Sequence, residues 1–591
     1  MASVSDRGLK AEEEGVPLLN DEHEHKPQPE IEETADKQRP PAIEKSNFIF
    51  DTIATVGISD DHLNDSISKH DQNTIFNDVL QVESRLAKKM LMCNIGPKIG
   101  ALDGLVVASP NKGEKPYLPN YYFTWTRDSA LVHSSLLPSF LPESYHKSYE
   151  WAGPSSASSD FQSYEMLESD IKLHEGLIRA YIQSQIKIQI TINPSGGLYD
   201  GGLNEPKFEV VGSPFTGDWG RPQRDGPALR ALTLIPYTHF LLDRGFRADF
   251  SYIEDNLYDP NELKVPGRII KNDLEEVSHS WHEPSFDLWE EVNGHHFFTL
   301  IVSMRSLQAG AALAYRLNDT GAQTFYSEQA ELIGKKLEEF WDNDKDYYLS
   351  TVPNLRRRKA GTSLLPDRQW WDCSLPLSLI HAGDHLSPNT YRYPNLSVLK
   401  FGATDPELQS TLYQYINSFS GLYKINAGHR WTDGWALGRY REDVYDGVGK
   451  SIANPWHICT NAVAESFYLM EKEHFIQGYL ETTNITRAFW SAVFGETIKQ
   501  GSRYNIGEVK FDEGLKALRR IGDAFLNVSR SAIMESDGRM SEQIDKKNGT
   551  PRGARDLTWS YASLMTAIKA RQESSKMVHE THQSSETVLA N

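Results

Sequence analysis

The spacing of apolar residues is helical from about residue 75 onward. Ala330, Ile333, Leu337 and Phe340 follow the 3.6-residue repeat of a helix with one apolar face. Similar apolar faces occur at residues 173–186, 228–242, 297–317 and 463–470, and across Leu518, Ile521 and Phe525. This repeated pattern predicts a chain built from many amphipathic or buried helices.

The segments between these helical faces are long and rich in Gly, Pro, Trp and Asp. Long irregular connections in a compact domain commonly carry functional residues. Runs with the pattern of paired strands and hairpin turns are scarce. We therefore predict an all-α fold, an α/α toroid whose site-bearing loops lie at one end.

The two ends of the chain differ in composition from the middle. The first 45 residues are rich in Asp and Glu and contain no Phe, Trp or Tyr, so they lack the apolar surface that ordering requires. We predict a disordered acidic N-terminal tail over residues 1–70, one helical domain over residues 71–571, and a polar C-terminal tail over residues 572–591.

Charge, cysteine content and targeting signals narrow the class of protein. A formal net charge of −20 argues against nucleic-acid binding, and three cysteines argue against a disulfide framework. The first 30 residues contain no basic segment followed by an apolar one, and the apolar stretch at 47–57 is too short to span a bilayer. We expect an intracellular protein, cytoplasmic or vacuolar, rather than a secreted one.

Two glutamates far apart in the chain each lie in a distinctive neighbourhood. Glu290 lies in FDLWEEVNG (286–294), and Glu542 lies in MSEQID (540–545), shortly before a second aromatic run. Hydrolysis of a glycosidic bond needs one carboxylic acid to protonate the leaving oxygen and one carboxylate to activate water or to attack carbon. Two acids among aromatic residues therefore favour a glycosidase.

Asp287 stands three residues before Glu290. If this segment is helical, the two carboxylates share a face and repel each other. That repulsion, together with desolvation by Trp289, raises a carboxyl pKa and keeps a proton available for donation. We expect Asp287 to tune Glu290 or to orient the sugar, and we keep it as a reserve candidate for the catalytic base.

Further clusters join aromatic residues to charged pairs. They are YYFTWTRDS (121–129), TGDWGRPQRDGP (216–227), LGRYREDVY (437–445), NPW (454–456) and ARDLTWSY (554–561). Sugar rings stack their C–H faces on aromatic rings and bind charged groups through their hydroxyls. These clusters indicate a sugar pocket. His295 and His296 lack further ligands at metal-binding spacing, so no metal site is predicted.

These runs, together with GLVVASP (104–110), resemble fungal glucoamylases and occur in the same order over roughly residues 80–570. The resemblance implies an (α/α)6 barrel, so that the predicted helical domain over residues 71–571 becomes the catalytic domain. It also implies exo-hydrolysis of α-1,4-glucosidic bonds at the non-reducing ends of starch, glycogen or maltooligosaccharides. The product would be β-D-glucose, released with inversion and without a cofactor.

The resemblance also implies roles for individual residues. Glu290 matches the general acid and Glu542 the general base, and inversion would place their carboxyl groups roughly 6.5–9.5 Å apart. The residues that match sugar contacts are Tyr121, Trp125, Arg127, Asp128, Trp219, Trp289, Glu291, Arg439 and Trp559.

Two alternatives remain open at the level of sequence. One is another inverting α/α-barrel glycosidase of the trehalase type. The other is a non-catalytic glycogen-binding protein on the same scaffold, although binding alone would not require both acids. As partners we expect an α-glucan or maltooligosaccharide substrate, no nucleic acid and no metal. We expect a monomer. We also expect no starch-binding domain, because only about 20 mostly polar residues follow Ala570, too few to form a domain.

Overall fold

The computed structural model describes residues 69–113, 118–139, 141, 168–353, 369–383, 401–534 and 536–589. All of them belong to one compact unit, residues 67–591. Residues 1–68 of the predicted N-terminal tail lie outside the described residues, and residues 69–70 begin the first described helix.

The described chain is mostly helical, as the apolar spacing predicted. Its α-helices are α2 (Lys69–Cys93), α3 (Thr126–Leu136), α5 (Glu168–Gln189), α6 (Asp225–Arg244), α7 (Arg247–Asn256), α8 (Ile269–Ser280), α9 (Phe297–Arg316), α10 (Thr320–Glu338), α11 (Ser374–Ala382), α12 (Pro406–Ser418), α13 (His457–Gln477), α14 (Arg487–Phe494), α15 (Val509–Met534) and α16 (Thr558–Leu589). Phe340, predicted on the face of α10, lies just beyond that helix but is fully buried. Helix α16 continues through most of segment 572–591.

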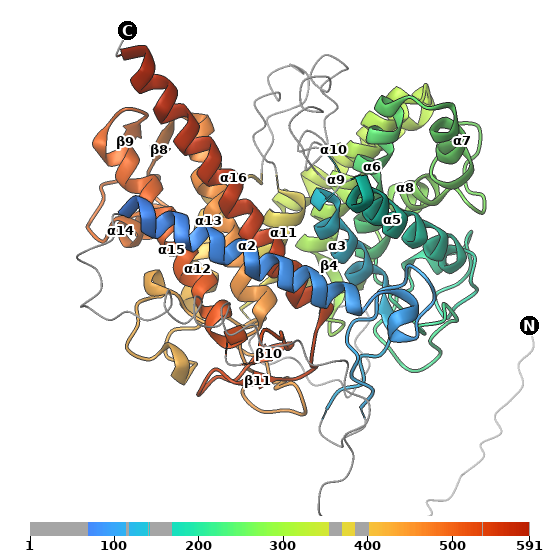
Figure 1. Ribbon diagram of the computed structural model, residues 1–591, viewed down its shortest axis with the longest axis horizontal. Coiled ribbons are helices and arrows are strands. Elements are labelled where there is room, and N and C mark those ends of the chain that lie inside the picture. The colour runs from blue at the N-terminus through green and yellow to red at the C-terminus, as the bar shows by residue number, and fades with distance from the viewer. Residues whose placement is uncertain are drawn as a thin grey trace, which may run out of the picture. The chain divides into compact units, whose positions relative to one another are not determined.

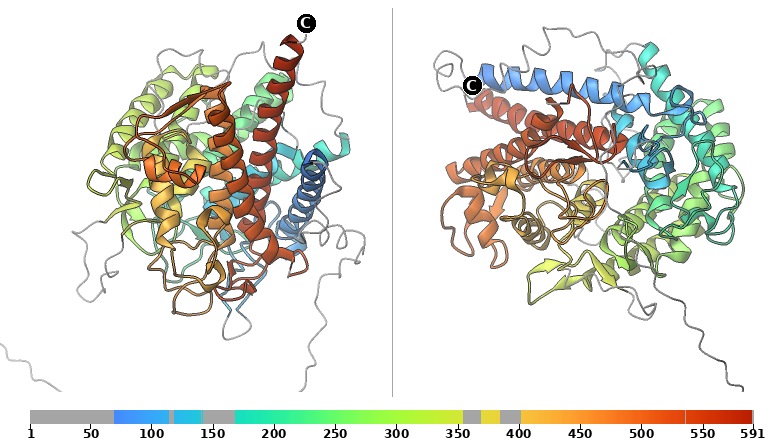
Figure 2. Two further views of the ribbon diagram at one scale, coloured as in Figure 1. Left: turned by 90° about the vertical axis from the view of Figure 1, so that its left-hand side faces the viewer. Right: turned by 90° about the horizontal axis from the view of Figure 1, so that it is seen from below.

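Six of the described helices form a closed inner ring. In chain order α3, α6, α9, α11, α13 and α16 each pack against the next, and α16 packs against α3. Each inner helix also has an outer partner: α5 on α3, α8 on α6, α10 on α9, α12 on α11, α15 on α13, and α2 on α16. The views in Figures 1 and 2 show α2 lying alongside α16. The arrangement confirms the predicted (α/α)6 toroid.

Burial separates the two layers. Almost every residue of the inner helix α13 is buried, whereas the outer helix α15 buries one face that includes Leu518, Ile521 and Phe525. A helix surrounded on all sides can be apolar all round, and an outer helix needs only one apolar stripe. Within the described residues, α9 has the length and apolar character of a membrane span, but 89% of that stretch is buried. Its composition reflects its place in the inner ring.

The strands are short and lie mostly in the connections. They pair antiparallel as β1 (Thr124–Trp125) with β2 (Lys207–Phe208), β3 (Ser285–Phe286) with β4 (Asn293–His296), β4 with β7 (Thr351–Pro353), β5 (Trp341–Asp342) with β6 (Tyr347–Tyr348), β8 (Tyr479–Glu481) with β9 (Arg503–Asn505), and β10 (Gln543–Ile544) with β11 (Pro551–Arg552). In Figure 1, β10 and β11 lie at the lower end of the helices. Strands β1, β4 and β10 each precede an inner helix.

A buried ion pair ties the inner layer to the outer layer. Arg230 of α6 donates through Nη2 and Nε to the carboxylate oxygens of Asp273 on α8, at 2.7 and 2.8 Å. Gln189 of α5 donates to the same carboxylate at 2.8 Å. Burial raises the pKa of Asp273, and the guanidinium opposes that rise. Each buried charge therefore depends on the other for its stability.

We expect Arg230→Ala to lower the free energy of unfolding by about 3–5 kcal/mol, because Asp273 would be left buried without its cation. Chemical denaturation measures this change. In the matched control Lys335→Ala, which breaks an ion pair whose side chains are both 66% exposed, the loss should stay below about 1 kcal/mol. An equal loss in both variants would contradict the importance of burial.

Candidate active site

The predicted site residues lie in the segments that precede the inner helices or in the first turns of those helices. Tyr121, Trp125, Arg127 and Asp128 lie before α3 or in its first turn, and Trp219 lies before α6. Asp287, Trp289, Glu290 and Glu291 lie before α9, and Arg439 lies before α13. Glu542 lies before α16, and Trp559 lies in the first turn of that helix. Because the inner helices form one ring, their leading segments can meet at one end of it.

Glu290 lies in the turn that joins β3 to β4, so the segment is not helical as the like-charge argument supposed. Its backbone has a φ of +67°, a region that residues other than glycine seldom occupy. The Asp287 carboxylate holds this turn, accepting hydrogen bonds from the backbone N–H groups of Glu291 at 2.7 Å and Val292 at 2.8 Å. Short polar side chains commonly close turns in this way.

One oxygen of the Glu290 carboxylate receives the side-chain donors. Trp125 Nε1 donates to Oε1 at 2.7 Å, and Gln223 Nε2 donates to the same atom at 3.1 Å. Arg127 Nη2 lies 3.8 Å from it. Both hydrogen bonds therefore fall on Oε1, which fixes the orientation of the carboxyl group.

Glu542 immediately precedes β10 and is fully buried. Its Oε2 accepts hydrogen bonds from the Tyr445 hydroxyl at 3.2 Å and from the Ala554 backbone N–H at 3.3 Å. Its Oε1 is buried without a hydrogen-bond partner among the described residues. Burial raises the pKa of Glu542 to about 7, against the opposing effect of hydrogen bonds such as that from Tyr121.

Gly553 forms the wall against which the Glu542 carboxylate lies. Its φ is +69°, and a Cβ atom built on it would come within 2.1 Å of Glu542 Oε2. Any larger residue would have to displace the carboxylate or the backbone. Glycine at this position therefore sets the place of Glu542.

A continuous chain of contacts joins the two carboxylates. Trp125, which donates to Glu290, packs edge-on against Tyr121 with ring centroids 5.8 Å apart. The hydroxyl groups of Tyr121 and Tyr445 lie 3.0 Å apart, and Tyr445 donates to Glu542. The structure thus brings both predicted catalytic glutamates to one aromatic wall.

A buried lysine supports the same wall from β2. Lys207 Nζ lies 3.5 Å from the ring centroid of Trp219 and 4.7 Å from that of Trp125, and these two rings are 6.0 Å apart. Burial lowers the pKa of Lys207 to about 8, and the charge of Glu290 opposes that effect. A cation against ring faces is attracted by their π electrons, so Lys207 stabilises this arrangement of indoles.

The other side of the site is organised by Arg439. Its Nη2 lies 2.8 Å from Glu291 Oε1, and its guanidinium donates to both carboxylate oxygens of Asp443, at 2.7 and 2.6 Å. The guanidinium carbon lies 5.4 Å from the ring centroid of Trp289. Trp289 in turn donates from Nε1 to Asp372 at 2.8 Å. Trp289, Glu291 and Arg439 therefore form one network.

Arg127 and Asp128 lie at the start of α3. Arg127 Nη1 donates to Asp225 Oδ2 at 2.8 Å and to Gln223 Oε1 at 3.0 Å. Burial raises the pKa of Asp128 to about 6, with Arg127 opposing. Trp559 is buried at the first turn of α16, and its role as a pocket wall stays a prediction.

The histidines that follow the Glu290 turn have neighbours other than metal ligands. The His296 ring is within hydrogen-bond distance of the Thr351 hydroxyl at 3.0 Å and the Ser285 carbonyl at 2.9 Å. In the part of the chain that the structure describes, no group of three or more His, Cys, Asp or Glu residues is arranged to hold a metal ion.

Several residues that contact the predicted site residues, among them Gln223, Tyr445, Lys207 and Gly553, are not candidates by sequence alone. Gln223 and Tyr445 lie inside runs that were noted for their aromatic and charged residues, so their neighbourhood was the available signal. Lys207 and Gly553 carry no such signal. Their importance arises from pairing between segments distant in the chain.

Comparison with known proteins places the chain in a family. The family model for glycosyl hydrolases family 15 matches residues 85–569. Glucoamylase-1 of Schizophyllum commune is 34% identical, with 83% of this chain and 73% of that protein covered. A probable glucoamylase of Schizosaccharomyces pombe is 33% identical, with 79% and 85% covered.

Solved structures agree with the sequence comparison. The family 15 glucoamylase from Hypocrea jecorina superposes with a TM-score of 0.67 at 32% identity, covering 84% of this chain and 72% of that one. The family match over residues 85–569 includes both Glu290 and Glu542. The chain belongs to glycosyl hydrolases family 15.

Proposed function

We propose that the chain is an exo-acting glucan 1,4-α-glucosidase that removes terminal glucose from the non-reducing ends of α-glucans and releases β-D-glucose with inversion. The observation that carries this proposal is the chain of contacts from Glu290 through Trp125, Tyr121 and Tyr445 to Glu542. It supplies two carboxyl groups beside rings on which a sugar can stack. The named glucoamylases among the relatives support the same reaction.

In this proposal Glu290 is the general acid. Its Oε1 already accepts two hydrogen bonds, from Trp125 and Gln223, as the carbonyl oxygen of a protonated carboxyl group can. The proton then resides on Oε2 and passes to the glycosidic oxygen as the bond to the anomeric carbon breaks. Asp287 acts as a positioning residue, because its carboxylate holds the turn that carries Glu290.

Glu542 is the general base. Its Oε1, buried and without a partner among the described residues, can accept a proton from a water molecule. The water oxygen then attacks the anomeric carbon on the face opposite to the leaving oxygen, which accounts for inversion. The proton from water ends on Glu542 and the proton from Glu290 on the leaving group, so the reaction is balanced.

Substrate binding is assigned to the surrounding residues. The indoles of Trp125 and Trp219 provide stacking surfaces, and Arg127 with Asp128 supplies charged partners for sugar hydroxyls. Arg439, tied to Glu291, provides a further charged contact. One chain supplies both glutamates and these contacts, so the proposed reaction needs no second copy.

Proton NMR of the anomeric signals during maltotriose hydrolysis tests the proposed reaction. We expect β-glucose to appear first. Removal of either proton-transfer group in Glu290→Gln or Glu542→Gln should lower kcat by about 10²–10⁴-fold. Glu331→Gln, at a surface site whose side chain is 66% exposed, should keep the wild-type rate.

The same experiment separates the alternatives. Initial α-glucose would mean retention and would overturn the inverting mechanism. Hydrolysis of trehalose but not of maltotriose would indicate a trehalase-type enzyme. Failure of the wild-type chain to hydrolyse either sugar while it still binds glycogen would leave a non-catalytic binding protein.

Gly553→Ala should lower kcat by roughly 10- to 100-fold with a smaller effect on KM, because the new methyl group displaces the Glu542 carboxylate. Steady-state kinetics with maltotriose measure this. Gly549→Ala is the matched control, since Gly549 has a similar φ of +82° in the same loop, but its Cβ would meet only Ile425, at 3.4 Å. Equal losses of kcat in the two variants would mean that backbone strain, rather than contact with Glu542, causes the effect.

The pH dependence of kcat/KM tests which glutamate is the base. Tyr445 donates to Glu542 and opposes the rise of its pKa to about 7, so Tyr445→Phe should raise that pKa further. Because the base must be ionised, we expect the acid-side limb to move to higher pH by on the order of half a unit. Tyr440→Phe, which removes a donor to Glu291, should leave that limb in place. Movement of the alkaline limb of the profile instead would mean that Glu542 acts as the general acid.

A further inference from the structure

A cavity lies outside the group of predicted catalytic and sugar-binding residues. It has a volume of about 850 Å³, and the described residues that line it include none of the predicted catalytic or sugar-binding residues. Its walls are formed by the loop around Tyr199, by three residues of segment 221–224 (Arg221, Pro222 and Arg224), by Lys264 and by the last turns of α8. Gln223, which contacts Glu290, lies within that wall segment, so the loop serves both the cavity and the active site. The cavity is large enough to hold several sugar rings.

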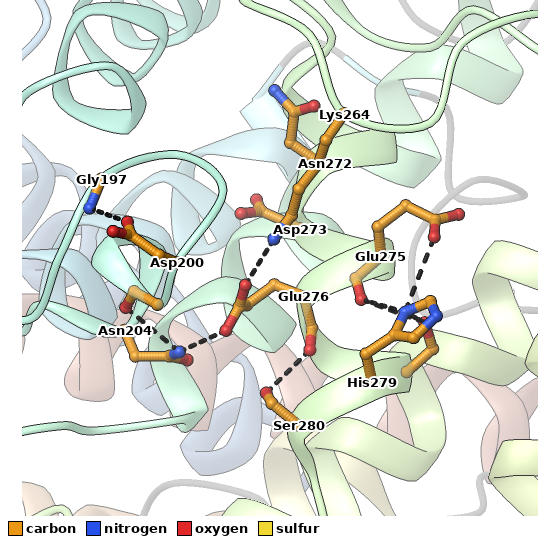
Figure 3. A network of polar contacts seen from close by, with 12 residues as sticks. Gly197, Asp200, Asn204, Lys264, Asn272, Asp273, Glu275, Glu276, His279 and Ser280 are labelled. Atoms are coloured by element: carbon orange, nitrogen blue, oxygen red, sulfur yellow. Dashed lines mark hydrogen bonds and ion pairs between the residues drawn. The ribbon is translucent and has the colours of Figure 1, made fainter.

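Glu276 of α8 organises the inner wall of this cavity. Its carboxylate accepts hydrogen bonds from Asn204 Nδ2 and from Lys264 Nζ, each at 2.5 Å, and Figure 3 shows these groups converging on it. Ser280 Oγ donates to the backbone carbonyl of Glu276 at 2.7 Å. The two bonds to the carboxylate join α8 to two other segments of the chain, so the wall is held in a defined shape.

Arg224 lies in this wall between two carboxylates. The residue is 8% exposed, and its Nη2 pairs with Glu283 while Nη1 lies 3.9 Å from Glu276. Its Nε is buried and has no hydrogen-bond partner among the described residues. Because Nε has almost no accessible surface, a ligand in the cavity would contact Arg224 at its other guanidinium nitrogens, beside Glu283 and Glu276.

The rim of the cavity is apolar and exposed. Tyr199 is 69% exposed and Leu263 is 72% exposed. The glycine-rich loop around Tyr199 holds the ring out beside polar groups, an arrangement that suits the C–H face of a sugar.

The balance of charge indicates the class of ligand. Four carboxylates line the cavity, from Asp200, Glu275, Glu276 and Glu283, against three cations, from Arg221, Arg224 and Lys264, and each cation is already paired with a carboxylate. An anionic ligand would meet this excess negative charge. A neutral ligand rich in hydroxyl groups can donate to the carboxylates and accept from the cations. A carbohydrate fits these requirements.

We propose that this cavity is a second α-glucan-binding site, in which Tyr199 stacks on a sugar ring and Arg224 and Glu283 bind its hydroxyls. The choice of an α-glucan rests on the proposed function, because the same polymer would then reach both sites. Binding here would hold a long substrate against the enzyme while its non-reducing end enters the active site.

Isothermal titration of the Glu542→Gln protein with maltoheptaose tests the proposal, since this variant should bind the sugar without consuming it. We expect two binding events, one for each site. Adding Tyr199→Ala should weaken one event by roughly three- to tenfold and leave the other unchanged. Adding Glu283→Gln, at a side chain that is 55% exposed, should weaken the same event. The control Tyr315→Ala removes a tyrosine that is 60% exposed and does not line the cavity, and it should change neither event.

A single binding event, or two events that Tyr199→Ala and Glu283→Gln leave unchanged, would overturn the second site. The proposed function is tested separately by hydrolysis of maltotriose by the wild-type chain. If that hydrolysis is absent while Tyr199→Ala still weakens one binding event, the reaction is wrong and the cavity is nevertheless a sugar site. If hydrolysis is present and the titration is unchanged, the reaction stands and the cavity proposal is wrong.

Discussion

The packing of α16 against α3 is the contact on which the rest of the molecule depends, because it joins the last inner helix to the first and closes the ring. With the ring closed, the segments that precede the inner helices gather at one end. Contacts between Trp125 and Glu290, and between Tyr445 and Glu542, exist only because segments far apart in the chain meet there. The scaffold thus supplies proximity, and the loops supply the chemistry.

Burial sets the chemistry of this end of the ring. Removing water from Glu542 raises its pKa, while hydrogen bonds from neighbouring groups limit the rise. The same exclusion of water lowers the pKa of Lys207, which its aromatic neighbours and Glu290 stabilise as a cation. The Glu290 turn adds a positive φ at the acid itself. The free-energy cost of burying these charges and of the positive φ is therefore located where the substrate is expected to react. The packing of the surrounding core offsets that cost.

Apolar periodicity was enough to predict the helices and the toroid, because buried faces repeat regularly wherever helices pack in two layers. Clusters of aromatic and charged residues located most of the constellation, and resemblance suggested the role of each glutamate. The conformation around Asp287 could not be predicted in this way, since a two-residue strand pair and a turn leave no periodic signal. Gly553 and Lys207 matter through contacts across the chain, which only the tertiary structure reveals.

A ring closed by its last helix has a consequence for the way the chain is made. Helix α3 begins at Thr126, whereas its closing partner α16 begins at Thr558. At about 5–20 residues per second of synthesis, roughly 20–90 s separate the appearance of the two helices. Until α16 is made, the apolar inner helices that are already synthesised, α9 among them once residue 316 has been added, lack the helix that closes the ring. Slow synthesis thus exposes this fold to aggregation, and protection of the nascent chain becomes part of its folding.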